Sequence, residues 1–433
     1  MYTSYIGKKF LQLYREKEKK PDDYSARQFF DEVLFPSFFD NEQHLMHVGN
    51  SPFFQKPKEE DVKLHGGKGK AQYQNLIREV EAGIPSGAIF VGYAAKEITA
   101  TSTGQLTSMK MDIDSEEIYA SWIGEALGIG VSGGLVMLID KSDILLTLFD
   151  GWKQYRKFIQ QTPNLKDKQI ETWNGQWLAH CFKDYFDPSD PLDNLNIETG
   201  EVLGKLAIPT KSWSEVVFCL AWKYPNERLT TYAYNLSQTN TTLGFIQLFL
   251  PEIQEMYELR DKIFISKDDV LLKDIEIAKL ETFYNFRNAC RMGTIGLKAL
   301  EPAKLREFMP SGSVPYAQGK DYKFTDENSK LNYSLYKLWI IAMLNKTELL
   351  QLATDTATAL LDYDNKGKGD NRGKTDKTQD IKKVKDAKHI REFIEGLTNI
   401  ISNTNAEIFH QLVKQAYIDV AVDNFPLFIT LIR

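Results

Sequence analysis

Apolar residues recur at helical spacing through most of the last hundred residues, and this periodicity constrains the fold more than any other feature. It predicts three amphipathic helices in succession, Ser329–Tyr363, Ile381–Ser402 and Asn405–Val422. Amphipathic helices that follow one another in sequence bury their apolar stripes by packing together. We therefore expect residues 326–433 to form an antiparallel helical bundle.

A strongly basic, glycine-bearing segment interrupts this bundle at residues 364–391. Its stretch Lys366–Arg391 carries ten Lys or Arg against four Asp, a surplus of six, in a chain whose net charge is -6. Such a local surplus attracts polyanions while the rest of the chain stays acidic. We expect a basic loop in which Lys382, Lys383 and Lys385 meet nucleic-acid phosphates. The alternative is a solvated connector without a ligand.

Length and composition indicate an ordinary globular protein of two or three domains. The chain has 433 residues, of which 42% are hydrophobic and 26% charged. Its three cysteines are far apart in sequence, which favours a reducing compartment. Neither a secretory signal nor an apolar run of about 20 residues is visible. We expect a cytoplasmic protein without a membrane partner.

The first 325 residues are expected to form a mixed α/β body with helical additions, which makes the whole chain α+β. Glycine- and proline-rich stretches divide this region into short segments. The predicted strands are Ala88–Ala95, Leu135–Asp140, Ile144–Phe149, Val216–Tyr224 and Arg228–Asn235. The predicted helices are Tyr5–Lys20, Ser25–Phe35, Gln72–Ala82, Leu243–Phe264, Asp269–Arg291 and Pro302–Phe308, and Gly312–Tyr322 is the best linker candidate.

Two polar stretches of this body are candidates for contact with DNA. Thr99–Lys110 is rich in hydroxyl groups, and Ser102, Thr103 and Gln105 can donate and accept hydrogen bonds. Lys68 and Lys70, in a glycine-rich basic stretch, are expected beside it. The alternative for Thr99–Lys110 is a solvated turn at the end of a strand.

The second stretch, Asn235–Thr242, carries amide and hydroxyl side chains next to Tyr232 and Tyr234. Asn235 and Gln238 are expected to contact bases there. A simpler reading places Thr241 or Thr242 as the N-cap of a following helix.

Catalytic patterns are close to absent from the sequence. Asp112 and Asp114 alternate as on one side of a strand and could hold a divalent metal, although Ser115 and the two glutamates after it also resemble the first turn of a helix. Gly124–Gly134 lacks the lysine of a phosphate-binding loop. We expect no catalytic residue, metal or cofactor.

Three segments together resemble the large subunit of type I CRISPR surveillance (Cascade) complexes. They are Gly151–Trp177 (GWKQYRKFIQQTPNLKDKQIETWNGQW), Phe283–Pro302 (FYNFRNACRMGTIGLKALEP) and the loop TSTGQLT at residues 101–107. The expected layout, an α/β body followed by a helical bundle, is similar too.

The resemblance implies a non-enzymatic subunit of an RNA-guided antiviral complex. Such a subunit reads the short motif that flanks the target in duplex DNA, helps to open the strands and recruits a nuclease-helicase. Its partners would be crRNA, target DNA and the other subunits of the ribonucleoprotein. Two alternatives remain, a restriction-type metal-dependent nuclease using Asp112 and Asp114, and a scaffold whose basic loop binds an acidic protein.

Overall fold

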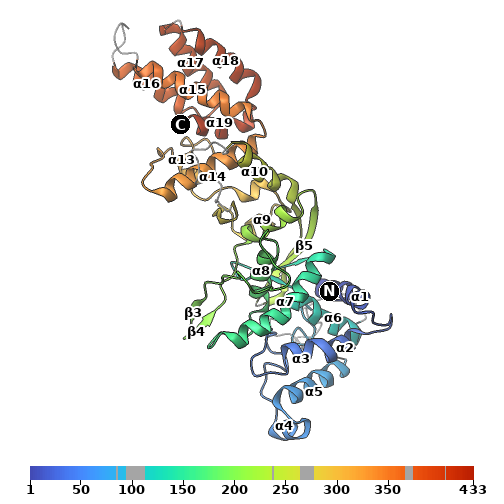
Figure 1. Cartoon of the computed structure of the whole chain (residues 1–433). Helices are drawn as coiled ribbons and strands as arrows, with labels where there is room; N and C mark the ends of the chain where they lie inside the picture. Colours follow the sequence, from blue (N-terminus) through green and yellow to red (C-terminus); the bar gives the residue numbers. More distant parts are fainter. Residues whose placement is uncertain (84–85, 94–112, 237, 264–276, 366–373, 405) are drawn as a thin grey trace. The chain divides into compact units, whose positions relative to one another are not determined.

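The computed structural model describes residues 1–83, 86–93, 113–236, 238–263, 277–365, 374–404 and 406–433, and among these the side chains of residues 238–241, 374–375 and 403–404 are not described. The chain folds into two compact units. Unit 1 comprises Met1–Pro251 and Asn285–Ile295, and unit 2 comprises Glu252–Tyr284 and Gly296–Arg433. The predicted bundle, residues 326–433, lies within unit 2. Helices predominate and one mixed sheet is present, so the α+β class is confirmed (Figure 1).

Two helices of unit 1 that are distant in sequence, α1 (Tyr2–Glu18) and α6 (Ser115–Ala126), pack with their backbones almost in van der Waals contact. Glycine makes this approach possible. A Cβ added at Gly7 would lie 1.9 Å from the carbonyl oxygen of Ala120, and one at Gly124 would lie 2.0 Å from that of Thr3. The antiparallel register of these contacts fixes α1 against α6.

Aromatic packing forms the next layer of unit 1. The helices α2 (Ala26–Phe29), η1 (Phe30–Leu34), α3 (Phe35–Phe38) and α5 (Lys68–Glu81) belong to this layer, whereas α4 (Glu59–His65) buries no residue. The rings of Phe39 and Phe53 stack with centroids 3.9 Å apart, and Trp122 meets both edge-on. The predicted end of the second helix at Pro36 is wrong. Pro36 is the second residue of α3, which continues from η1 without a break, so the helical conformation runs past the proline to Phe38.

The sheet of unit 1 has the strand order β1–β2–β5–β6–β7. Its strands are antiparallel except for the parallel β6–β7 pair. They are β1 (Ile129–Val131), β2 (Leu135–Ile139), β5 (Arg228–Asn235), β6 (Gln238–Phe249) and β7 (Thr294–Ile295), and a separate hairpin is formed by β3 (Gly200–Val202) and β4 (Lys205–Ala207). The predicted strands at 135–140 and 228–235 are confirmed.

Three other predicted strands are wrong. Of the predicted strand Ala88–Ala95, residues 88–92 form turns and a bend and residues 94–95 lie outside the described residues. Ile144–Phe149 lies inside α7 (Ser142–Gln161), and Val216–Tyr224 belongs almost entirely to α9 (Trp213–Lys223). Short apolar runs carry no period that separates a buried strand from a buried helix. Tertiary contacts decide between helix and strand. In α7, Leu145 and Leu148 are buried, and Gly151 leaves room for the ring of Trp177 from α8 (Ile170–Cys181).

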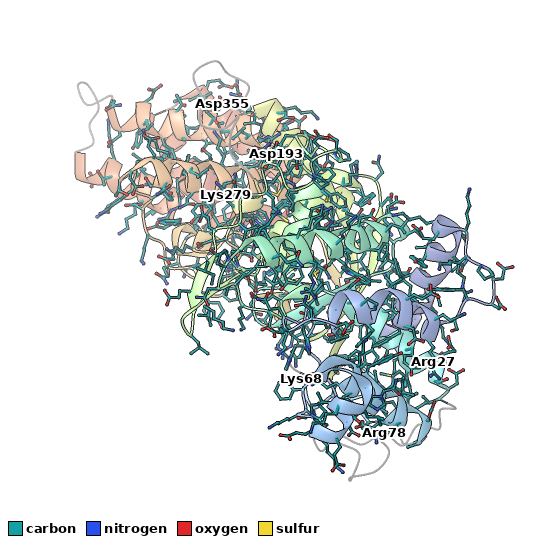
Figure 2. The ribbon with its side chains drawn as sticks, turned by 60° about the horizontal axis from the view of Figure 1, so that its bottom comes forward. Arg27, Lys68, Arg78, Asp193, Lys279 and Asp355 are labelled. Carbon is teal, nitrogen blue, oxygen red and sulfur yellow. The ribbon has the colours of Figure 1, made fainter. Side chains whose placement is uncertain are left out.

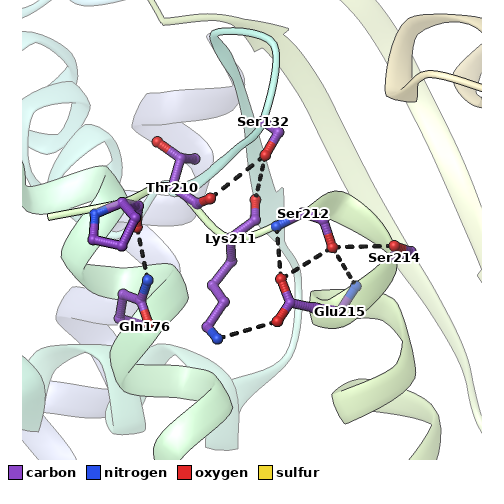
Figure 3. A network of polar contacts seen from close by, with 8 residues as sticks. Ser132, Gln176, Thr210, Lys211, Ser212, Ser214 and Glu215 are labelled. Atoms are coloured by element: carbon purple, nitrogen blue, oxygen red, sulfur yellow. Dashed lines mark hydrogen bonds and ion pairs between the residues drawn. The ribbon is translucent and has the colours of Figure 1, made fainter. Parts of the chain in front are cut away.

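A polar network fixes the start of α9 (Figure 3). Ser212 and Glu215 form a reciprocal capping box, and Lys211 reaches the same carboxylate at 3.2 Å. The hydroxyl of Ser132, after β1, donates to the carbonyl of Lys211 over 3.1 Å, and Gln176 of α8 donates to that of Pro209 over 2.7 Å. These bonds hold residues 209–215 to the β1–β2 turn and to α8.

The region between the sheet and the bundle is less helical than the sequence predicts. Residues 243–249 belong to β6, so the predicted helix Leu243–Phe264 is correct only from Leu250 onward. Its remaining elements are α10 (Leu250–Ile263), η3 (Ile277–Lys279), α12 (Phe286–Cys290), η4 (Leu297–Leu300) and α13 (Leu305–Phe308). Of the predicted helix Asp269–Arg291, residues 269–276 lie outside the described residues and 280–285 are not helical.

The helical bundle of unit 2 is confirmed in kind but not in the bounds of its helices. It contains α14 (Glu327–Leu344), α15 (Glu348–Asn365), α16 (Lys374–Lys385), α17 (Ile390–Thr404), α18 (Glu407–Asp419), η5 (Val422–Asn424) and α19 (Phe425–Ile432). The single helix predicted for Ser329–Tyr363 is broken at Asn345, whose backbone is left-handed (φ 49°). Ile381–Ser402 likewise forms parts of two helices, α16 and α17.

Candidate nucleic-acid interface

The lysines predicted to form a flexible basic loop lie on a helix instead. Residues 374–385 form α16, so the loop prediction is wrong there, and residues 366–373 lie outside the described residues. The helix is anchored by Val384, which is fully buried and packs against Gly396 of α17. Tyr363 of α15 donates a hydrogen bond to the buried Asp380 over 3.1 Å. The lysines of α16 therefore occupy fixed positions.

Lys382, Lys383 and Lys385, the lysine cluster of α16, carry uncompensated charge. Lys382 and Lys383 are exposed and Lys385 is half-buried. None of the three side chains forms a hydrogen bond or ion pair within the part of the chain that the structure describes. Lysines in a last helical turn also complement the helix dipole, which gives them a structural role besides any ligand.

Lys385 also lines a pocket that combines aromatic rings with cations, which we call the aromatic pocket. The cavity has a volume of about 310 Å³ and lies wholly within unit 2, between α13, residues 320–324, α14, the end of α16 and α19. Its rings are Phe308, Tyr322, Phe324, Tyr333 and Tyr336. Its cationic side chains are Lys320, Lys337, Lys385 and Arg433, and its one acidic side chain is Asp321.

The rings of the aromatic pocket contact one another in a continuous cluster. Tyr322 is central, with its centroid 4.7 Å from that of Phe308, 5.3 Å from that of Phe324 and 5.2 Å from that of Tyr333. Its hydroxyl donates to the carbonyl of Ser329, and Tyr336 donates to that of Ala303 over 3.0 Å. Burial raises the pKa of Tyr336 to about 12.

Arg433 is held at the pocket by contacts from two other segments. Its Nη2 donates to the carbonyl of Gly319 over 2.8 Å, and its guanidinium pairs with Asp386 at 3.4 Å and Asp321 at 3.7 Å. The side chain is only 7% exposed. Its Nε is nevertheless buried without a hydrogen-bond partner among the described residues.

The segment predicted as a linker, Gly312–Tyr322, supplies one wall of this pocket. Gly319 donates its backbone N–H to Met309 over 2.9 Å, and Lys320 donates to Glu307 over 2.9 Å. The segment therefore folds back on α13 inside unit 2 and does not connect the units.

The other predicted site residues lie elsewhere. Lys68 and Lys70 are exposed on the first turn of α5 in unit 1, and Lys68 is labelled in Figure 2. Cations are unfavourable at that end of the helix dipole, so the dipole does not account for them. Figure 1 places α5 well apart from β5, which carries Asn235 in the same unit. Ser102, Thr103 and Gln105 lie outside the described residues.

Asn235 and Gln238 pair with each other across the β5–β6 turn, and both are strand residues. The helix N-cap expected at Thr241 or Thr242 is therefore wrong. The side-chain oxygen of Asn235 accepts a hydrogen bond from Arg287 over 3.0 Å. Tyr234 is fully buried and donates to Glu125, which removes it from any surface beside these amides.

Potential metal ligands do not gather in the part of the chain that the structure describes, where no group of three or more His, Cys, Asp or Glu could hold an ion. Asp114 caps α6 by accepting from the N–H of Glu117 over 2.7 Å, so the first-turn interpretation of this stretch is confirmed. Asp112 lies outside the described residues.

The rings of the aromatic pocket and Arg433 were not predicted from the sequence. A signal was present, since residues 320–337 (KDYKFTDENSKLNYSLYK) interleave aromatic residues with lysines. Arg433 gave no signal, because its partners Gly319 and Asp386 are distant in sequence.

Comparison with protein families, with curated proteins and with solved structures gave no match. No helix within the described ranges is long and apolar enough to cross a bilayer.

Proposed function

We propose that this chain binds nucleic acid without catalysing a reaction, and that it does so through the lysine cluster of α16 and the adjoining aromatic pocket. The observation that carries the proposal is the position of Lys385, a cation that belongs to both and has no partner within the described residues. Proteins that bind nucleic acid strands combine cations along the backbone with aromatic rings for the bases. The same combination is built here on rigid helices.

The biological setting that we propose follows the sequence resemblance. The chain would act as the large subunit of a type I CRISPR surveillance complex, together with crRNA, target DNA and further protein subunits. There it would read the target-flanking motif in duplex DNA, help to open the strands and recruit a nuclease-helicase. Lys68, Lys70, Ser102, Thr103, Gln105, Asn235 and Gln238 remain candidates for the duplex contacts.

The salt dependence of binding tests the lysine cluster. Binding of a fluorescent single-stranded oligonucleotide to the full chain is measured by anisotropy over a series of salt concentrations. Each phosphate contact on a single strand contributes about 0.7 to the slope of log affinity against log salt. Replacing Lys382, Lys383 and Lys385 by Glu should therefore flatten the slope by roughly 2 if all three contact phosphates.

A second triple variant controls for net charge. Lys157, Lys205 and Lys414 are exposed, and their side chains have no partner among the residues that the structure describes. Replacing them by Glu changes the total charge equally, and the slope should stay near that of the unaltered chain. Equal flattening in both variants would contradict a site on α16, and an unaltered chain that binds no oligonucleotide would overturn the proposed function. If the chain is instead a scaffold, it should bind no oligonucleotide but should bind an acidic protein.

A further inference from the structure

The aromatic pocket offers open ring surface to a ligand. Phe324 is 58% exposed and Tyr333 is 40% exposed, and their centroids lie 5.1 Å apart in an edge-to-face arrangement. Both rings contact Tyr322, which is itself fixed by its hydrogen bond to Ser329. A flat ring placed against Phe324 or Tyr333 would extend a cluster that is already in place.

Arg433, one of the residues that line this pocket, carries a buried hydrogen-bond donor without an acceptor among the described residues. The Nε of Arg433 is buried and unpaired, while the two terminal nitrogens of its guanidinium are engaged by Gly319, Asp321 and Asp386. A buried donor without a partner costs free energy, so an acceptor brought by a ligand would be favoured. The neighbouring Lys385 makes an anionic acceptor the best match.

We propose that the aromatic pocket takes one unpaired nucleotide of a single strand. The base lies against Phe324 and Tyr333, and a phosphate oxygen accepts from the Nε of Arg433 beside Lys385. This inference rests on the proposed function and names the form of nucleic acid that the site selects. A paired base cannot present its face to these rings, because its neighbours in the duplex cover both faces.

The size of the pocket agrees with this occupant. Its volume of about 310 Å³ is at the lower end of the range for small-ligand pockets, which suits a single nucleotide. An acidic peptide would satisfy Arg433 and Lys385 but would leave the exposed faces of the two rings without a flat partner. The combination of rings and cations therefore favours a nucleotide over a carboxylate-rich chain.

The experiment compares a single-stranded oligonucleotide with a duplex of the same sequence, using the full chain and two variants, Phe324→Ala and Tyr333→Ala. Either substitution should weaken binding of the single strand by roughly 5- to 150-fold, the range for loss of one base–aromatic stack. Binding of the duplex should change little. Tyr417→Ala is the matched control, because Tyr417 is 78% exposed on α18 in the same unit and lies outside the pocket.

Arg433→Lys tests the phosphate contact separately. It retains the positive charge but removes the Nε donor, so affinity for the single strand should fall while the salt slope stays unchanged. Its thermal unfolding is measured alongside, because Arg433 also holds Asp321 and Asp386. The two ring variants test the proposal even if this one unfolds, since both rings are exposed.

Four results would overturn the inference. If Phe324→Ala and Tyr333→Ala bind the single strand as the unaltered chain does, the pocket does not hold a base, while the proposed function stands. Equal losses on single strand and duplex would mean that the rings do not select unpaired bases. A labelled poly-glutamate peptide that binds as tightly as the strand, and is weakened by Tyr333→Ala, would assign the pocket to an acidic protein. An unaltered chain that binds neither nucleic acid would remove the proposed function as well.

Discussion

Two carboxylic acids, Glu125 at the end of α6 and Glu171 at the start of α8, are buried in the interior of unit 1. Tyr234 of β5 donates to Glu125 over 2.6 Å, whereas Oε1 of Glu171 has no partner among the described residues. Burial raises the pKa of both groups above the ordinary 4.5, and for Glu171 the charge of Glu125 adds to the effect. Within the part of the chain that the structure describes, no cation lowers either pKa, so the interior favours the protonated forms.

This pair should make unit 1 less stable as the pH rises. In the unfolded chain the two groups titrate near 4.5, so between that pH and the neutral range the folded state binds more protons. The free energy of unfolding is therefore highest below 4.5, as far as these groups are concerned, and falls as the pH rises through their folded pKa values. Glu125→Gln should reduce the total change in the free energy of unfolding over this pH range by roughly 1–3 kcal/mol, because one unit of pKa shift corresponds to about 1.4 kcal/mol.

Urea unfolding at a series of pH values measures the effect. Glu198→Gln, at an exposed carboxylate of the same unit without a partner within the described ranges, should leave the pH profile unchanged. A Glu125→Gln profile as steep as that of the unaltered chain would show that Glu125 does not carry the dependence.

At the scale of elements, the α1–α6 crossing depends on two glycines whose roles the sequence does not reveal. Gly7 and Gly124 lie inside helices, where glycine is unfavourable relative to alanine. Both positions face backbone carbonyls at distances too short for a Cβ. Burial of apolar side chains at the close approach offsets this loss in helix propensity. Ile6, Phe10 and Ile123 are fully buried.

Gly7→Ala and Gly124→Ala should each destabilise unit 1, although alanine is the better helix former. Backbone atoms cannot move aside as a flexible side chain can, so the cost should reach the upper end of the roughly 1–3 kcal/mol typical of overpacking. Thermal unfolding measures it. Gly200→Ala is the control, because a Cβ there meets nothing within 4 Å. Unchanged melting temperatures in the first two variants would mean that α1 and α6 separate without cost.

Elements were predicted well where the sequence has a period and poorly where it has only an apolar run. The amphipathic stripe of Asn405–Val422 gave α18, and that of Ser329–Tyr363 gave the helical residues of α14 and α15 but not the break between them. Val216–Tyr224 was misassigned as a strand although Ser212 and Glu215, which stand just before it, match the capping-box pattern of a helix start. Residues 243–249 were misassigned in the opposite sense, because the pairing of β6 with β5 overrides local preference.

At the scale of the whole molecule, the chain passes between its two units three times, after Pro251, Tyr284 and Ile295. Unit 2 is therefore assembled from separate segments of sequence. Trp339 of α14 donates to the carbonyl of Leu297 over 3.0 Å, and Glu252 accepts from the N–H of Leu297 over 3.1 Å. These contacts join the bundle to residues that precede 326.

A fragment that begins at Glu252 should fold better than one that begins at Asp326. Trp339 is the sole tryptophan of both fragments, and it is 3% exposed in the full chain. In residues 326–433 alone it loses the carbonyl of Leu297 as a hydrogen-bond acceptor, so its fluorescence should shift to longer wavelength and the melting temperature should fall. Identical emission and melting in the two fragments would show that residues 252–325 do not support the bundle.

The sequence by itself determined the helical bundle, two strands of the sheet and the basic segment that became α16, because periodicity and charge are local properties that neighbouring residues carry together. Only the tertiary structure decided which apolar runs became helices, which tyrosine was buried against Glu125, and which residues meet in the aromatic pocket. Tyr322, Lys385 and Arg433 come from segments far apart in the chain. Their proximity in the pocket depends on how α14, α16 and α19 pack, and packing is set by the fit of side chains that no local pattern specifies.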